Sequence, residues 1–170
     1  MAGTYDTNVV IDDGTAIHIT VMSSANDVML FLQEFRSNTL IVGLATTRTR
    51  SRSSSSASAA TACFLVHASI RFVGVGNNGD AQKLFEDYDL QVANTVDPSH
   101  VAAEALWWPL LQQAGLKAVA RAVMGVQIDK PRRVTMSQWD TQVLTEQVRY
   151  TTINPFVSYE IGRQLLHDEY

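Results

Sequence analysis

The alternation of two hydrophobic periods along this chain is the feature that most constrains its fold. Residues 41–44 and 70–75 are short apolar runs with the length and composition of buried strands. Residues 27–35 and 80–90 instead carry apolar side chains at helical spacing. Strands that alternate with helices in this way predict an α/β fold, in which helices pack on the faces of a sheet. A length of 170 residues fits one such domain.

The two ends of the chain have simpler patterns than the middle. Residues 8–22 predict two short strands around a turn at residues 12–14, because apolar and polar side chains alternate in the second of them. Residues 90–97 predict a further strand. The last third is helical in pattern, with Gly125 as a stop signal and an interruption at Pro155.

Composition excludes several classes of protein. A single cysteine, Cys63, excludes a disulfide framework and a thiolate zinc cage, and we expect it to be a small buried apolar residue near a helix end. A net charge of −4 argues against a protein that coats nucleic acid electrostatically. No apolar run reaches the roughly 20 residues of a membrane span, and the first residues do not have the pattern of a signal peptide. We therefore expect a nuclear or cytoplasmic protein that is neither secreted nor bound to a membrane.

A low-complexity segment occupies residues 46–62, where serine, alanine, threonine and arginine replace the apolar periodicity. This composition predicts a flexible loop. Its arginines, Arg48, Arg50 and Arg52, could bind phosphates, and its serines could be phosphorylated. A solvated basic loop is the simpler interpretation.

Four segments together resemble a known family. They are IVGL at residues 41–44, FVGVGNNGDAQKL at 72–84, AGLKAVARAVMG at 114–125, and the motifs within 136–162. They look like the Werner-syndrome-type 3′-5′ exonuclease domain in its plant form, a member of the DEDDy group of nucleases. The resemblance implies one exonuclease-like domain over residues 1–170.

The implied fold is a ribonuclease-H-like mixed sheet flanked by helices. In the family, two further strands follow the first motif strand. Here the serine-rich segment stands in their place. The resemblance therefore implies that two strands of the sheet are missing after residues 41–44.

The family's chemistry implies a two-metal site built from four carboxylates and loaded with Mg²⁺ or Mn²⁺. Its first two carboxylates follow the IVGL strand, but here Ala45 and Thr47 occupy those positions. The third is retained as Asp80. The last motif, Tyr-x-x-x-Asp, is present as Tyr150 followed by Asn154. One of the four carboxylates therefore remains.

This deficit predicts an impaired enzyme that retains residual nucleic-acid binding. Asp80 and Tyr150 are catalytic remnants, Asn154 is a substituted position, and Asp80 is a weak metal ligand with no metal expected to be bound. A kink at Pro155 would displace Tyr150 and Asn154 further. The simpler interpretations are a helix-terminal aspartate for Asp80 and a buried aromatic residue for Tyr150. The alternative function is a non-catalytic protein-interaction module on the same scaffold.

The basic residues of the family's substrate groove suggest the partner. We expect weak binding of nucleic acid through five basic residues of this chain: Lys117, Arg121, Lys130, Arg132 and Arg133. The missing strands would leave an open sheet edge, which also favours a protein partner or self-association.

The remaining aromatic and histidine residues carry weaker signals. Trp107, Trp108 and Trp139 could stack on bases, although a place in the core is the more common role of such residues. The four histidines have no metal-ligand spacing.

Overall fold

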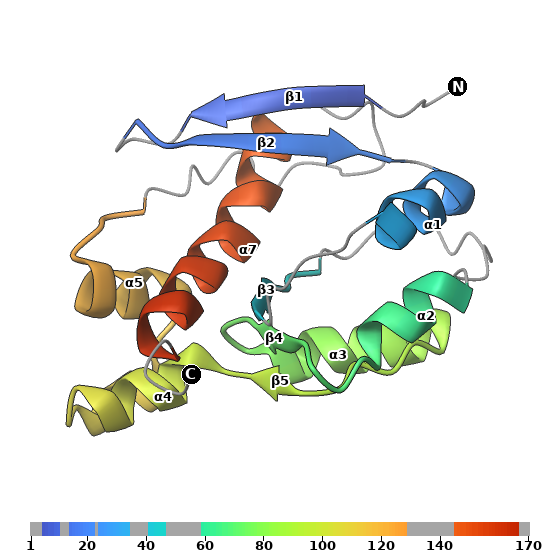
Figure 1. The fold of residues 1–170 in the computed structure, drawn as a ribbon. Helices are drawn as coiled ribbons and strands as arrows, with labels where there is room; N and C mark the ends of the chain where they lie inside the picture. The colour runs from blue at the N-terminus through green and yellow to red at the C-terminus, as the bar shows by residue number, and fades with distance from the viewer. Residues whose placement is uncertain are drawn as a thin grey trace.

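The computed structural model describes residues 5–10, 14–22, 24–34, 41–46, 59–128 and 145–166. These residues form two small sheets and a set of helices, as Figure 1 shows. The elements are β1 (Tyr5–Val10), β2 (Ala16–Val21), α1 (Ala25–Glu34), β3 (Ile41–Gly43), α2 (Ala59–Leu65), β4 (Arg71–Val73), α3 (Asn77–Tyr88), β5 (Thr95–Val96), α4 (Pro98–Ala105), the 3₁₀ helix η1 (Pro109–Gln113), α5 (Leu116–Met124) and α7 (Thr145–Leu165). The predicted α/β class is confirmed.

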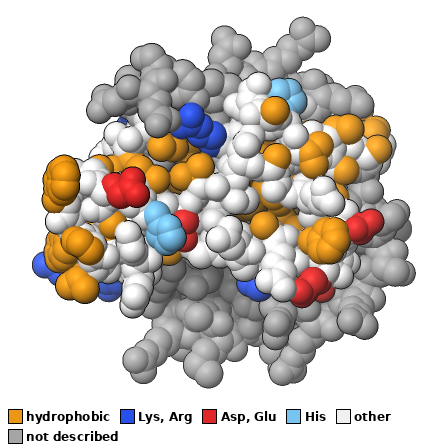
Figure 2. All heavy atoms as spheres, turned by 90° about the horizontal axis from the view of Figure 1, so that it is seen from below, with side chains coloured by type: hydrophobic (Ala, Val, Ile, Leu, Met, Phe, Trp, Pro, Cys, Tyr) orange, Lys and Arg blue, Asp and Glu red, His pale blue; other side chains and the backbone are white. Residues whose placement is uncertain are grey.

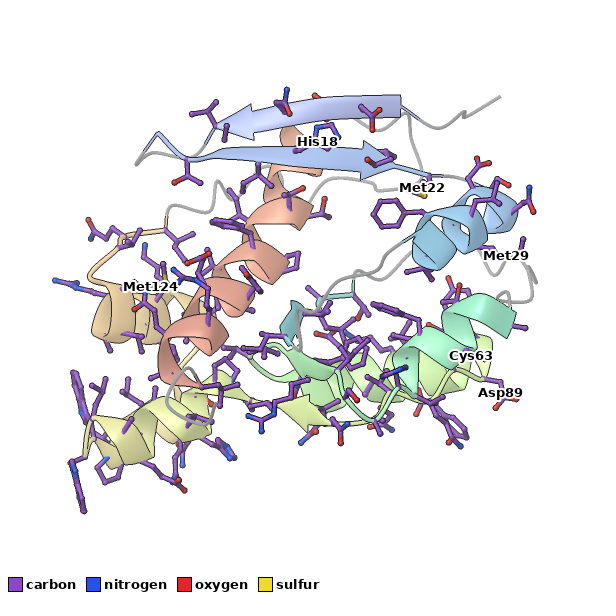
Figure 3. The ribbon with its side chains drawn as sticks, viewed as in Figure 1. His18, Met22, Met29, Cys63, Asp89 and Met124 are labelled. Atoms are coloured by element: carbon purple, nitrogen blue, oxygen red, sulfur yellow. The ribbon has the colours of Figure 1, made fainter. Side chains whose placement is uncertain are left out.

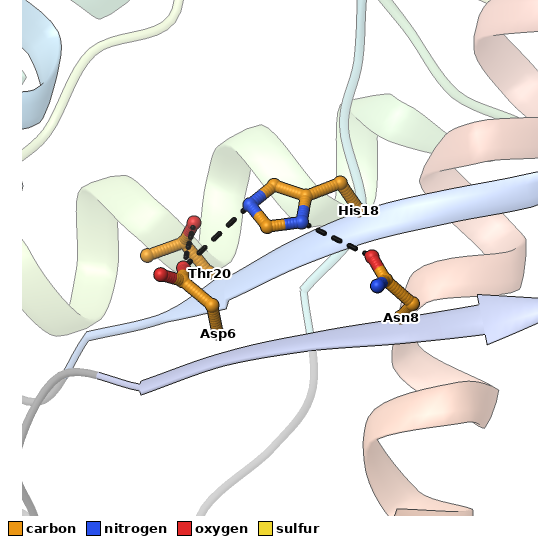
Figure 4. Close-up of polar contacts among 4 residues, drawn as sticks. All are labelled: Asp6, Asn8, His18 and Thr20. Carbon is orange, nitrogen blue, oxygen red and sulfur yellow. Dashed lines mark hydrogen bonds and ion pairs between the residues drawn. The ribbon is translucent and has the colours of Figure 1, made fainter.

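The N-terminal strands form the predicted hairpin. β1 and β2 pair antiparallel from Tyr5 opposite Val21 to Val10 opposite Ala16, and Gly14 has a φ of 86°. A ladder of polar side chains lies on its exposed face (Figure 4). There the Thr20 hydroxyl donates to Asp6 Oδ1 at 2.7 Å, and His18 Nδ1 lies 3.1 Å from Asn8 Oδ1. This hairpin is a separate sheet from the one that positions the candidate site.

The second sheet is parallel, in the order β3-β4-β5. Pairing continues past β3, because the Leu44 amide donates to the Val73 carbonyl at 2.8 Å. The prediction that residues 38–44 lie in the sheet beside residues 70–76 is therefore confirmed for residues 41–44, while residues 38–40 lie outside the described ranges. Among the described residues no strand intervenes between β3 and β4, and α2 is the described element there.

Helix α2 corrects the end of the predicted serine-rich loop. The loop was expected over residues 46–62, but α2 begins at Ala59. Alanine-rich sequence has high helix propensity, and Leu65 at the end of α2 is buried against Phe72. Residues 47–58, with the arginines of the segment, lie outside the described residues. Cys63 is exposed on α2 (Figure 3), so the expectation that it is buried was wrong.

Several boundaries differ from the predicted ones for local reasons. Helix α3 begins at Asn77, earlier than the predicted start at Asp80, and β5 is only Thr95–Val96. Helix α4 begins at Pro98 because Asp97 caps it: the carboxylate accepts hydrogen bonds from the Ser99 amide and hydroxyl. Helix α7 continues through Pro155, where the sequence predicted an interruption.

The main core lies among α4, α5 and α7. Residues Leu116, Val119 and Ala120 form the buried face of α5, as the sequence predicted, and Ile161 of α7 packs in the same cluster. A smaller cluster joins Leu65 to Phe72 on the other part of the sheet. No helix within the described ranges has both the length and the apolar character needed to cross a bilayer.

Candidate functional site

The candidate site lies at the carboxyl end of the parallel sheet, where a glycine turn leads from β4 into α3. Gly76 has a φ of 72°, a conformation that favours glycine, and its amide donates to Asp97 Oδ2 at 2.8 Å. The Asn77 amide group donates to the carbonyls of Phe72 at 3.0 Å and Val96 at 2.9 Å. These bonds tie the start of α3 to both β4 and β5.

Asp80 is placed by that turn in the first turn of α3. A carboxylate in this position is stabilised by the free amides and the dipole of the helix N-terminus. Its side chain is only 15% exposed, and Lys83 Nζ lies 3.5 Å from its Oδ1. Both the interpretation as a metal ligand and the interpretation as a helix-terminal residue fit this position.

A residue from the first motif contacts Asp80 directly. The Thr46 hydroxyl donates to Asp80 Oδ1 at 2.5 Å and is partly buried, while Ala45 beside it is exposed. Thr46 follows β3, and Asp80 follows β4. The structure therefore brings the first and second motifs together, as two neighbouring parallel strands require.

Helix α7 crosses the sheet antiparallel to β3. Gly162 faces Val73 and Ile41, and Gly43 faces Pro155 so closely that a Cβ on Gly43 would lie 1.8 Å from the Pro155 carbonyl oxygen. Residues that precede Pro155 on α7 therefore lie toward the carboxyl end of β3. This arrangement brings the third motif to the same end of the sheet as Thr46 and Asp80.

Asn154 lies at that end with one polar atom unpaired. Its Oδ1 is buried and has no hydrogen-bond partner among the described residues. An unpaired buried carbonyl costs free energy, about 1–3 kcal/mol in typical cases. The substituted third-motif position is therefore a poorly satisfied part of the site.

The structure describes only some of the other predicted site residues. Tyr150 belongs to α7, but its side chain is outside the description. Lys117 and Arg121 are exposed on α5. Lys130, Arg132 and Arg133 lie outside the described residues, as does Trp139. Trp107 and Trp108 are exposed, so the expectation that they belong to the core was wrong.

The donor set does not fit a two-metal centre. Two divalent ions require several negatively charged oxygen ligands. Thr46 and Asn154 offer neutral oxygens, and the one carboxylate, Asp80, already accepts a hydrogen bond and lies beside Lys83. Within the described part of the chain, no group of three or more His, Cys, Asp or Glu side chains could hold a metal ion.

Three contributions to this site were not predicted from the sequence. Thr46 was assigned to the loop, and neither Asn77 nor the link from Asp97 to Gly76 was anticipated. The Asp-Pro-Ser sequence at residues 97–99 is a helix-start signal that could have identified the cap on α4. The Thr46 contact joins residues far apart in sequence and carries no local signal.

Comparison with other proteins gives three informative relatives. Exonuclease 3′-5′ domain-containing protein 2 of Homo sapiens is 34% identical over 103 residues, which are 60% of this chain and 17% of that protein. A 3′-5′ exonuclease of Arabidopsis thaliana is 26% identical over 94 residues, 55% of this chain and 32% of the relative. The bifunctional 3′-5′ exonuclease/ATP-dependent helicase WRN of Mus musculus is 30% identical over 102 residues, 59% of this chain and 7% of the relative. The matches thus span less than a third of each relative's length.

Among solved structures, the EXD2 exonuclease domain soaked in Mn aligns with a TM-score of 0.42 at 20% identity, covering 84% of both chains. No protein-family model matches the chain. The three sequence relatives share the name of 3′-5′ exonuclease. The predicted resemblance is confirmed at this level: over 55–60% of its length, this chain is similar to proteins named as 3′-5′ exonucleases.

Proposed function

We propose that this chain is a nucleic-acid-binding relative of the 3′-5′ exonucleases in which hydrolysis is impaired. One observation carries the proposal: the hydroxyl of Thr46 donates to Asp80, the one carboxylate left at the motif positions. That bond engages an oxygen that a metal ion would need. Ala45, Thr47 and Asn154 supply no replacement for the missing negative charge.

The expected loss of activity is large. Phosphodiester hydrolysis in such sites depends on metal ions that generate the nucleophile and stabilise the leaving oxygen. Removing even a single group that stabilises a transition state commonly costs about 3–4 kcal/mol, or 10²–10³ in rate. With three carboxylates absent, we propose weak binding of Mg²⁺ or Mn²⁺ and turnover near background.

The basic residues of the chain still support one part of the family's function, the attraction of phosphate groups. Lys117 and Arg121 are exposed and lie one turn apart on α5. With Lys130, Arg132 and Arg133 they form a basic set in the sequence. Because the net charge is −4, we expect binding at the non-specific level of about 10⁻⁴–10⁻⁶ M.

A digestion assay tests the catalytic half of the proposal. Labelled single-stranded DNA and recessed duplex DNA are incubated with Mn²⁺ and the unaltered chain, its Asp80→Asn variant, and a triple variant carrying Ala45→Asp, Thr47→Glu and Asn154→Asp. We expect no cleavage by the first two. Cleavage by the unaltered chain that disappears in Asp80→Asn would contradict the proposal.

Fluorescence anisotropy with a single-stranded oligonucleotide tests the binding half. Affinity should fall as salt rises, with log K changing by about 0.7 per phosphate contact per log unit of salt. Alanine at Lys130, Arg132 and Arg133 should weaken binding and flatten this slope. If no binding occurs at low salt, the protein-interaction module becomes the preferred function.

A further inference from the structure

The turn that joins α4 to η1 displays large apolar side chains to solvent. Trp107 is 92% exposed, Leu110 79%, Trp108 51% and Leu106 43%. Figure 2, which shows the molecule from below, has a group of hydrophobic side chains at its left end, where α4 ends. Exposed apolar residues are usually scattered singly, so four within five positions indicate a surface used for contact.

A defined hydrogen-bond pattern holds this turn. The Leu106 amide donates to Ala102 at 2.9 Å, the Trp108 amide to Ala103 at 2.9 Å, and the Leu111 amide to Trp108 at 3.0 Å. Trp107 has a φ of 51°, a left-handed conformation that is costly for a bulky side chain. The turn is also anchored in the core, since Ala103 and Leu111 are buried on its two sides. The backbone conformation of this hydrogen-bonded turn therefore holds the two tryptophan side chains in solvent.

Positive charge adjoins the turn. Helix α5 packs on α4 and carries Lys117 and Arg121 on its exposed side. Lys or Arg side chains appear beside the hydrophobic group in Figure 2. Glu104 is the exposed acid on the last turn of α4. Flat aromatic faces with nearby cations match the chemistry of single-stranded nucleic acid, whose bases stack while its phosphates attract cations.

A second copy of the chain fits this surface less well. A fully buried aromatic side chain contributes about 150–250 Å², so two tryptophans and two leucines at these exposures offer on the order of 500 Å². A stable dimer normally buries about 800 Å² on each partner. The small size of the surface, combined with its aromatic character, favours bases as the occupant.

We propose that Trp107 and Trp108 form a stacking platform for the bases of single-stranded nucleic acid, with Lys117 and Arg121 attracting the backbone. This inference rests on the proposed nucleic-acid function and specifies the form of nucleic acid bound. None of the four side chains belongs to the Thr46–Asp80 site. The platform would therefore hold a strand whether or not cleavage occurs.

The test compares three ligands: a ~12-nucleotide oligothymidylate, an abasic strand of equal length and a blunt duplex, each titrated by anisotropy and tryptophan fluorescence. The oligothymidylate should bind most tightly and quench the fluorescence. Trp107→Ala and Trp108→Ala should each weaken its binding about 5- to 150-fold, the usual range for one base–aromatic stack. Binding of the abasic strand should not change.

Matched variants keep the result interpretable. Trp107→Phe retains an aromatic face and should keep most of the affinity, whereas Leu110→Ala removes an apolar side chain that is exposed but not aromatic and should have little effect. Thermal unfolding checks that each variant folds. If the oligonucleotide binds but the Trp107→Ala/Trp108→Ala double variant binds equally well, the platform is overturned and the proposed function stands.

Two other results would distinguish the stacking platform from the proposed function and from self-association. If no ligand binds at low salt, both the proposed function and the platform fail. If Leu110→Ala lowers the sedimentation coefficient of the protein as strongly as Trp107→Ala does, the turn is a self-association surface, and the platform is overturned.

Discussion

The two ends of the contact between α7 and the parallel sheet differ in quality. At Gly162 the helix meets the methyl groups of Val73 and Ile41, and the neighbouring Ile161 is fully buried. At the other end Asn154 leaves a buried oxygen unpaired, and a threonine hydroxyl engages the remaining carboxylate. The Gly162 end is packed with apolar groups, while the Asn154 end holds polar groups whose hydrogen bonding is incomplete. The apolar contacts of α7 and its polar contacts with the sheet therefore lie at opposite ends of the same helix.

The largest effect on stability is expected from Gly43→Ala, which changes the closest contact between β3 and α7. Its Cβ would lie 1.8 Å from the Pro155 carbonyl oxygen, so the helix or the strand must move. Such overpacking against backbone should cost about 3 kcal/mol or more. Urea unfolding measures the loss.

Gly79→Ala provides the matched control, because a Cβ there has open space within α3. Replacing a helical glycine with alanine should stabilise the protein by about 0.5–1 kcal/mol. If Gly43→Ala unfolded at the same urea concentration as the unaltered chain, the close approach of α7 to β3 would be wrong.

Asn77→Ala should be the next most costly change. It removes the side-chain donor shared by the Phe72 and Val96 carbonyls and should lower the free energy of unfolding by about 1–3 kcal/mol. The exposed neighbour Asn78→Ala should change it by less than about 0.5 kcal/mol. If the two variants lowered the free energy of unfolding equally, the hydrogen bonds of the Asn77 side chain would not stabilise the site.

Thr46→Val tests the bond between the first two motifs. Loss of the hydroxyl should cost about 1 kcal/mol, since the bond is charge-assisted but Asp80 keeps some access to solvent. The same change removes the hydroxyl donor from Asp80 Oδ1 and leaves only Lys83 beside it, so Mn²⁺ affinity by calorimetry should rise slightly. A fall in Mn²⁺ affinity would mean that the hydroxyl assists the site.

The smallest effect is expected from Asn154→Leu. This variant removes the unpaired buried oxygen while keeping a similar volume, so stability should stay the same or rise by up to about 1 kcal/mol. Thermal unfolding beside Asn154→Asp gives the contrast, because a buried carboxylate without a counter-charge should destabilise the helix. A strongly destabilised Asn154→Leu protein would indicate that the amide has a partner.

Much of the scaffold could be predicted because its signals are local. The alternation in β2, the helical spacing in α1 and α5, and the apolar runs of β3 and β4 each lie within a few residues. The serine-rich segment obscured the start of α2, whose stability depends on the burial of Leu65 against a distant strand.

The candidate site was harder to predict because its decisive contacts are not local. Motif spacing predicts which carboxylates are retained and which are missing, but the bond between Thr46 and Asp80 depends on the pairing of two strands. The more common role of tryptophan, a place in the core, does not apply to Trp107 and Trp108, because hydrophobicity alone does not distinguish a core residue from one exposed by a strained turn. Those positions are set by the backbone around them.

The close approach of Gly43 to Pro155 also has a consequence for folding during synthesis. Strand β3 emerges from the ribosome well before helix α7, which covers it, so this face of the sheet can be completed only after α7 has been synthesised. Contacts between such distant segments slow folding, because a long loop must close before they form. A ribosome stalled before α7 should therefore hold a chain whose sheet is still open to chaperones.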